Sequence, residues 1–206
     1  MSDDFTLLEK WREGDPRAGS ALLRRHFDSL QRFFTNKVGD DASDLIQRTM
    51  EALVKSRDRF RGDSSFRTYM FVIARNELYS HLRKLRKERA LFDPESHSIH
   101  DLGGSPSKAV EAHRENKLLF ESLRRLPLDL QVALELFYWE GLEGAELADV
   151  LGIPVGTVKS RLRRGKELLR KHMERLAKTG AELEQTRGDL EQWARGVRGD
   201  LVEVSN

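Results

Sequence analysis

The chain has 206 residues, 34% of them charged and 38% hydrophobic, which suits one ordinary domain or two small soluble helical domains with thin cores. The absence of cysteine excludes disulfides and thiolate metal sites. No apolar run approaches the roughly 20 residues of a membrane span, and the N-terminus lacks the apolar stretch of a signal peptide, so we expect a cytoplasmic protein.

The net charge of +2 conceals an uneven distribution along the chain. Residues 1–92 carry nineteen Lys/Arg and fourteen Asp/Glu (19 − 14 = +5), and residues 117–176 carry eleven and nine (11 − 9 = +2). Residues 93–116 and 177–206 are acidic, with balances of 2 − 5 = −3 and 4 − 6 = −2. Two basic blocks separated by an acidic segment favour polyanionic partners.

The first third of the chain is predicted to be helical throughout. Apolar residues recur at three- and four-residue spacing from Leu7 to Phe34, and Gly14-Asp15-Pro16 divides this stretch into two helices, with Asp15 as the N-cap of the second. A third helix is expected to start after Gly39-Asp40-Asp41. Its apolar stripe consists of Leu45, Ile46, Met50 and Leu53.

Residues 60–84 combine a polar turn with an aromatic and basic helix. The turn Gly62-Asp63-Ser64-Ser65 offers backbone amides, hydroxyls and a carboxylate. Aromatic rings beside cations suit unstacked nucleic-acid bases, because every base has a π-face. The spacing of Phe66, Tyr69, Met70 and Ile73 fits a helix whose aromatics all lie in the core equally well, so the residues alone leave both interpretations open.

The segment 93–107, rich in Ser, Gly and Pro, indicates a flexible linker. Beyond it the pattern predicts a helix from Pro127 to Tyr138, a short helix over 143–151 closed by Gly152, a tight turn, and a longer helix over 155–173. This order is typical of a helix-turn-helix. We therefore predict an all-α fold of two small helical domains joined by a flexible linker, the second a helix-turn-helix domain.

The longer helix of the helix-turn-helix has one apolar and one basic face. Val158, Leu162, Gly165 and Leu169 are spaced to pack inward. Lys159, Ser160, Arg163 and Arg164 then point outward, where they can contact base edges in a major groove. Thr157, Arg161 and Lys166 lie nearer the flanks and are expected to contact phosphates. The alternative is a solvated basic face on a core helix.

Three stretches together resemble the extracytoplasmic-function sigma factors of bacteria. They are DASDLIQRTMEAL (41–53), FRGDSSFRTYMFVIARN (60–76) and the run from Leu126 to Leu169. The resemblance covers roughly residues 5–175, and it rests on the order of the blocks and not on any single motif. It implies that the chain binds core RNA polymerase and promoter DNA, melts the promoter and has no catalytic activity or cofactor of its own.

The resemblance also assigns roles to residues. For polymerase binding it implies Asp41, Asp44, Leu45, Gln47 and Glu51. For melting and reading the minus-ten element it implies Arg61, Gly62, Asp63, Ser64, Ser65, Phe66, Tyr69, Arg75 and Asn76. For reading the minus-thirty-five element it implies Thr157, Lys159, Ser160, Arg161, Arg163, Arg164 and Lys166. Tyr69 and Lys159 depart from the Trp and Arg that are common in the family, so the promoter sequence cannot be transferred by analogy.

The resemblance divides the chain into four parts. Residues 1–92 form a sigma-two-like domain, 93–108 a linker, 109–176 a sigma-four-like domain, and 177–206 a tail of unknown role. Relatives are commonly held by an anti-sigma factor, which is therefore a candidate partner. The tail repeats Leu176, Leu183, Leu190 and Val197 every seven residues, and with Trp193 on this seam it is a candidate regulatory segment.

Two other functions each fit part of the sequence. A free-standing helix-turn-helix regulator would explain residues 126–175 but would leave the aromatic turn unused. A metal-dependent nuclease could use Asp40, Asp41 and Asp44, although no general base is evident beside them. His97, His100 and Asp101 form a further, weak candidate metal site.

Overall fold

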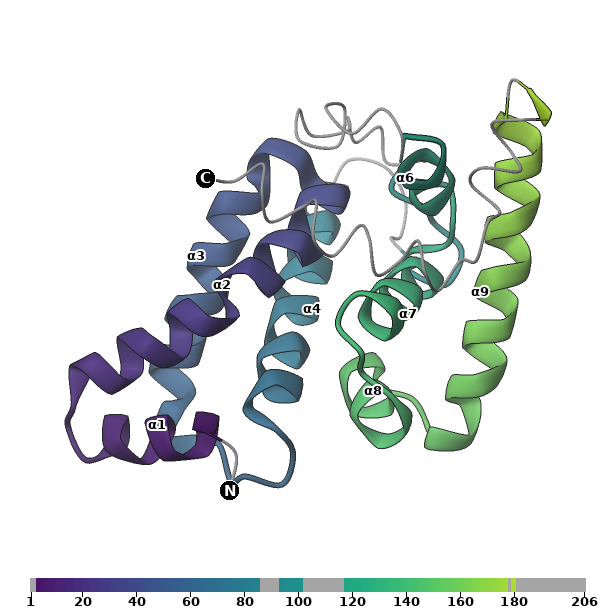
Figure 1. Cartoon of the computed structure of the whole chain (residues 1–206). Coiled ribbons are helices and arrows are strands. Elements are labelled where there is room, and N and C mark those ends of the chain that lie inside the picture. Colours follow the sequence, from purple (N-terminus) through teal and green to yellow (C-terminus); the bar gives the residue numbers. More distant parts are fainter. Residues whose placement is uncertain (1–2, 86–92, 102–116, 178, 181–206) are drawn as a thin grey trace.

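The computed structural model describes residues 3–85, 93–101, 117–177 and 179–180, and its described elements are helices (Figure 1). The first group comprises α1 (Asp3–Arg12), α2 (Pro16–Val38), α3 (Ala42–Ser56) and α4 (Phe66–Leu85), with the 3₁₀ turns η1 (Gly39–Asp41) and η2 (Arg57–Arg59). The second group comprises α6 (Lys117–Arg124), α7 (Leu128–Tyr138), α8 (Gly144–Leu151) and α9 (Val155–Leu176). The predicted all-α class, with a helix-turn-helix in the second half, is confirmed.

The helix boundaries follow local signals in the sequence. The carboxylate of Asp15 accepts a hydrogen bond from the backbone N–H of Arg17 (2.8 Å), and Pro16 opens α2, as predicted. Gly152 ends α8 with a φ of +64°, a conformation that glycine adopts without steric cost. Its N–H is bonded to the carbonyls of Ala148 and Asp149.

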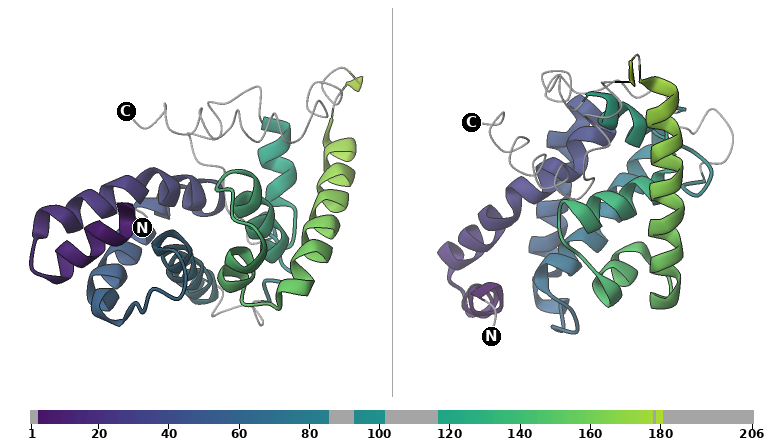
Figure 2. Two further views of the ribbon diagram at one scale, coloured as in Figure 1. Left: turned by 60° about the horizontal axis from the view of Figure 1, so that its bottom comes forward. Right: turned by 45° about the vertical axis from the view of Figure 1, so that its right-hand side comes forward.

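The two helix groups pack directly on each other, mainly through α4 against α8 and α2 against α6. One continuous apolar core joins them, from Phe34, Phe71 and Leu78 in the first group to Val132 and Leu147 in the second. A smaller core lies between α6, α7 and α9. Helices α1 and α9 stand at opposite ends of the molecule (Figures 1 and 2).

The described part of the predicted linker is packed against the second group. The N–H of Leu128 donates to the carbonyl of His97 (2.9 Å), and the N–H of His100 donates to the carbonyl of Arg124 (2.9 Å). Ile99 is buried in the shared core. Residues 93–101 are therefore docked and not free, because Ile99 has an apolar site to fill. Most of the predicted tail (178 and 181–206, with Trp193), like residues 102–116, lies outside the described residues.

Candidate nucleic-acid interface

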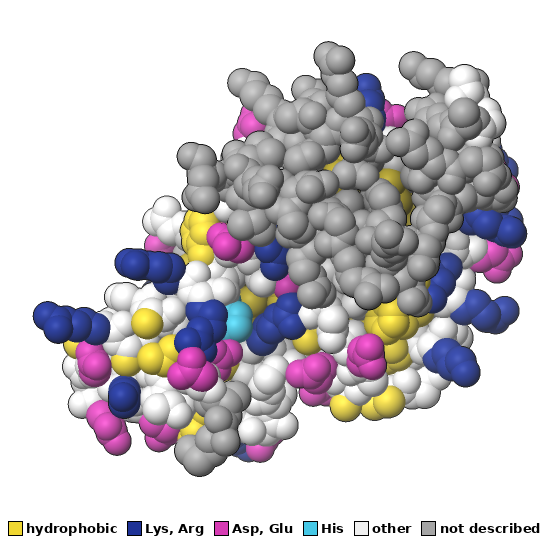
Figure 3. All heavy atoms as spheres, in the orientation of Figure 1, with side chains coloured by type: hydrophobic (Ala, Val, Ile, Leu, Met, Phe, Trp, Pro, Cys, Tyr) yellow, Lys and Arg dark blue, Asp and Glu magenta, His cyan; other side chains and the backbone are white. Residues whose placement is uncertain are grey.

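Helix α9 presents a basic face at one end of the molecule. Val158, Gly165 and Leu169 are buried beneath it, and a Cβ on Gly165 would lie 3.1 Å from Leu134 Cγ, so this glycine allows α9 to approach α7 closely. Arginine and lysine side chains gather along the outer edge of the molecule over α9 (Figure 3). The exposed polar residues of this face are Lys159, Ser160, Arg163, Arg164 and Lys166. The predicted inward and outward faces of α9 are thus both observed.

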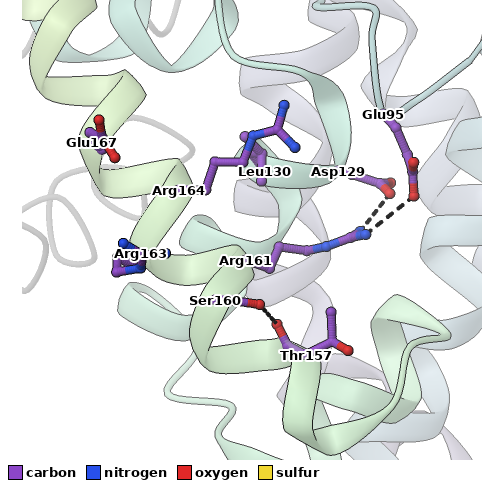
Figure 4. Close-up of a pocket in the computed structure, with 9 residues that line it drawn as sticks. All are labelled: Glu95, Asp129, Leu130, Thr157, Ser160, Arg161, Arg163, Arg164 and Glu167. Atoms are coloured by element: carbon purple, nitrogen blue, oxygen red, sulfur yellow. Dashed lines mark hydrogen bonds and ion pairs between the residues drawn. The ribbon is translucent and has the colours of Figure 1, made fainter.

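Arg161 differs from its neighbours on α9. Its guanidinium donates to Asp129 Oδ2 (2.6 Å) and to Glu95 Oε1 (3.3 Å), and its side chain is 13% exposed. Figure 4 shows Arg161 reaching toward these two carboxylates. Arg161, Asp129 and Glu95, with neighbouring residues of α9, line a cavity of about 320 Å³. In this structure Arg161 joins α9 to α7 and to the docked segment 93–101, and it is not presented to DNA.

The turn that precedes α4 exposes polar groups. Gly62 has a φ of +81°, and Arg61, Asp63 and Ser65 are exposed. The Ser65 hydroxyl accepts a hydrogen bond from the backbone N–H of Thr68 (3.1 Å), so Ser65 caps α4. A turn held at its end by a helix cap, with a glycine in the left-handed region, presents its side chains in a defined arrangement.

The aromatic residues next to this turn belong largely to the core. Phe66 is buried, and its ring contacts those of Phe60 and His26. Tyr69 is half-buried, with its ring centroid 4.8 Å from that of Phe60. Phe66 therefore cannot stack on a base without leaving the core, whereas Tyr69 retains a partly open edge.

Not all predicted minus-ten residues lie together. Asn76 is exposed, but it is ten residues beyond Phe66 on α4, about 15 Å along the helix axis, and so lies away from the turn. The Arg75 guanidinium lies 4.5 Å from the Tyr79 ring and close to Gly152 of α8. Arg75 thus belongs to the surface between the helix groups.

The second helix group covers part of the turn. Glu146 on α8 accepts hydrogen bonds from the hydroxyls of Ser65 (3.0 Å) and Thr68 (3.1 Å). Glu140, which is buried, pairs with Arg32 (3.0 Å) and with Arg67. These contacts place carboxylates beside a surface that would receive an anionic strand, and so they oppose DNA binding there.

A groove between α2 and α3 offers a third surface. It has a volume of about 480 Å³ and is lined by apolar and polar side chains, among them Phe27, Ile46, Gln47 and Met50. Phe27 is 43% exposed, although its sequence pattern placed it with the core residues of α2. Spacing does not show this, since Phe27 lies three and seven residues before the buried Leu30 and Phe34.

The predicted polymerase-binding residues of α3 divide by burial. Asp41, Asp44, Gln47 and Glu51 are exposed, and Gln47 donates a hydrogen bond to Glu51 Oε1 (3.1 Å). Leu45 has no exposed surface and lies in the core. Leu45 therefore supports the helix and is not available to a partner, because its position falls on the buried stripe that the sequence itself indicated.

Within the residues that the structure describes, no three His, Asp or Glu side chains converge as a metal site. Of the predicted metal candidates, the Nδ1 of His97 lies 3.0 Å from the carbonyl of Asp93 and that of His100 lies 3.9 Å from Asp101 Oδ1. No described helix is long and apolar enough to cross a bilayer.

Comparison with known proteins decides the family. Residues 22–88 match the family model of Sigma-70 region 2, and residues 117–169 match that of Sigma-70 region 4. The RNA polymerase sigma-H factor of Pseudomonas aeruginosa is 30% identical over 187 residues, which cover 85% of this chain and 96% of that protein. The ECF RNA polymerase sigma-E factor of Haemophilus influenzae is 27% identical over 184 residues, with 84% and 96% coverage. The chain belongs to the extracytoplasmic-function (ECF) sigma factors.

Solved structures agree with this assignment. A sigma factor RpoE from Bartonella quintana, solved with the anti-sigma factor NepR, matches with a TM-score of 0.58 and 25% identity over 75% of this chain and 96% of that one. CnrH, solved with the cytosolic domain of CnrY, matches the fold with a TM-score of 0.63 at 22% identity, over 85% and 100% of the two chains. This ECF sigma factor recognises promoters in transcription initiation, with core RNA polymerase and promoter DNA as its partners, which confirms the predicted function.

Proposed function

We propose that the sigma factor reads the minus-thirty-five element through α9 and the minus-ten element through the turn 61–65, and that it binds polymerase through α3 and the groove beside it. The observation that carries the proposal is the exposed basic face of α9, formed by Lys159, Arg163 and Arg164 on the second helix of a helix-turn-helix. The predicted divisions 1–92, 93–108, 109–176 and 177–206 are part of this proposal. The protein acts in the cytoplasm and performs no chemistry itself.

Run-off transcription with core polymerase tests the proposal. The protein should start transcription at specific sites across a genomic promoter library. Footprinting without polymerase distinguishes the free-standing regulator. Tight, specific duplex protection by the protein alone, with no run-off product when polymerase is added, would contradict the proposal.

The closed arrangement of the helix groups must open for both elements to be read. Their centres are about 25 base pairs apart, or about 85 Å of duplex. A compact chain of this length has a radius of gyration of only about 17 Å. In the closed arrangement the hydroxyl of Ser65 also donates a hydrogen bond to Glu146 on α8, so it is not available to a base. We therefore infer that the helix groups separate when the sigma factor binds polymerase.

An anti-sigma factor is proposed as a further partner. The RpoE protein of Bartonella quintana was solved with such a factor, and the present chain adopts the same fold. A protein that binds both helix groups at once would hold the closed arrangement and block promoter binding. Addition of the cognate factor should abolish run-off transcription and leave the isolated polymerase unaffected.

A further inference from the structure

Helix α1 contacts the chain immediately before the turn 61–65. The Arg12 guanidinium donates through Nε and Nη2 to the carbonyl of Arg57 (3.2 and 2.8 Å) and through Nη2 to the carbonyl of Phe60. Its Nη1 donates to Glu9 Oε1 (2.7 Å). Carbonyls at the end of a helix lack partners within the helix. The Arg12 guanidinium donates to the carbonyl of Arg57, at the end of α3, and to that of Phe60, just before the turn. It thereby holds these two points of the chain together.

Helix α1 is itself held firmly against α2. The indole of Trp11 packs on Gly19, where an added Cβ would lie 2.5 Å from the ring, so the contact requires glycine. At the other end of α1, Asp4 pairs with Arg25 (2.7 Å) and His26 (2.7 Å). Contacts at both ends leave α1 little freedom to move relative to α2. Arg12 is therefore a donor on a rigid support.

The ring of Phe5 on α1 also lies close to the turn. A Cβ added at Gly62 would lie 3.7 Å from Cε2 of Phe5, whose side chain is 37% exposed. On the far side of the turn, Ser65 caps α4. Residues Arg61 to Ser64 therefore lie between two segments that hydrogen bonds hold in place. On one side Arg12 binds the carbonyls of Arg57 and Phe60, and on the other Ser65 caps α4. The Phe5 ring lies close to Gly62.

We propose that Arg12 is a positioning residue for the turn 61–65, and that the Phe5 ring supports the same turn from the side of α1. The Sigma-70 region 2 match begins at residue 22, after the end of α1. The inference rests on the proposed function, in which the turn receives an unpaired base. A pocket that discriminates among bases needs donors and acceptors held in place, because misaligned groups lose most of a hydrogen bond's value.

The test measures base discrimination in the polymerase holoenzyme. Four promoters that differ only in the captured base of the minus-ten element are transcribed with Arg12→Ala, Arg12→Lys and Lys10→Ala. Lys10 is exposed on the same helix, and its ammonium pairs with no carboxylate among the residues that the structure describes, so Lys10→Ala controls for the loss of a cation.

With Arg12→Ala, the ratio of transcription from the preferred promoter to the other three should fall by about tenfold, the equivalent of one well-made hydrogen bond. Arg12→Lys should give an intermediate ratio, since one ammonium cannot reproduce the guanidinium fork. Lys10→Ala should match the wild type. All variants should bind the isolated minus-thirty-five duplex equally, because α9 lies at the other end of the molecule.

Asp63→Ala distinguishes failure of the proposed role of the turn from failure of the positioning role of Arg12. If Asp63→Ala and the other turn variants keep full discrimination, the proposed role of the turn is wrong. If they lose it while Arg12→Ala keeps the wild-type ratio, the positioning role alone is wrong. Equal loss from all four promoters with a lowered Tm would assign Arg12 to folding and overturn the inference.

Should Arg12→Ala fail to fold, Phe5→Ala provides the second variant, since its side chain is partly exposed. It should reduce the same ratio. An unchanged ratio with Phe5→Ala would then overturn the proposal.

Discussion

Burial separates basic residues that look alike in the sequence of α9. Arg161 is held by Asp129 and Glu95, whereas Arg163 and Arg164 are exposed. Removing one partner of a buried ion pair costs about 3 kcal/mol or more, because the other charge is left without compensation. Arg161 is thus assigned to stability, and only the exposed arginines remain available to DNA in this structure.

Arg164→Ala should weaken binding of an isolated minus-thirty-five duplex by about 1–3 kcal/mol, the range for a base-reading contact. Titrations at several salt concentrations measure the effect. Arg170→Ala is the matched control, since Arg170 is exposed on the same helix, six residues further along. Equal losses for the two variants would show that general charge, and not recognition, explains the result.

His26 links pH to the docking of α1. Burial lowers the pKa of His26, and the pairing with Asp4 opposes this only in part. Arg25 and Arg67 also face the ring and disfavour its protonation. A histidine whose pKa is lower in the folded state contributes stability above its unfolded value near 6.5 and loses that contribution as the pH falls below it.

The free energy of unfolding should therefore decrease between about pH 7.5 and pH 5.5, and His26→Gln should make this decrease shallower. Denaturant titrations across this range measure the slope. Burial also lowers the pKa of His172, so part of the slope should remain. His100→Gln, at an exposed position, controls for the loss of one imidazole. An unchanged slope in His26→Gln would contradict the expectation.

At the scale of the element, α3 shows what periodicity can and cannot predict. The stripe of Leu45, Ile46, Met50 and Leu53 was predicted from spacing, and it faces the core with Met50 partly buried. The same stripe removes Leu45 from the candidate partner surface. Phe27, in contrast, reaches the groove from α2, because two helices must cross before a groove exists between them.

Phe27→Ala should reduce association with core polymerase by about tenfold, since a partly exposed aromatic in an interface contributes through its burial on binding. Val54→Ala is the control, since Val54 is 48% exposed on α3 and does not line the groove. Competition binding to core polymerase measures both. Thermal unfolding should change little for either variant. If both variants bind polymerase like the wild type, the groove is not the polymerase contact.

At the scale of the whole molecule, buried charges join the helix groups. Lys37 of α2 is fully buried and pairs with Glu135 of α7, and burial lowers the pKa of the Lys37 ammonium while Glu135 opposes this. The Tyr79 hydroxyl donates to Asp129, and burial raises the pKa of that tyrosine. Such pairs stabilise little relative to well-packed apolar groups, but they specify one arrangement. They also become hydrated on separation, which lowers the cost of opening.

Glu140→Ala should shift the protein toward the open arrangement. The change leaves Arg32 without its buried partner in the closed form, at a cost of about 3–5 kcal/mol, and costs little once Arg32 reaches water. Small-angle scattering should give a larger radius of gyration. Glu143→Ala, at an exposed position in the same loop, is the control. Identical scattering from Glu140→Ala and the wild type would show that the closed arrangement does not depend on this pair.

The sequence by itself determined the helix-turn-helix, the Asp15 cap of α2, the Gly152 end of α8 and the inward and outward faces of α9, because spacing and capping act over a few neighbouring residues. It also indicated the family, since two motif blocks stand in a set order. The tertiary structure alone decided the partners of Arg161, the exposure of Phe27, the docking of residues 93–101 and the bracing of the turn by Arg12. Those depend on which surfaces meet, and segments as distant as α1 and η2 carry no local signal of their contact.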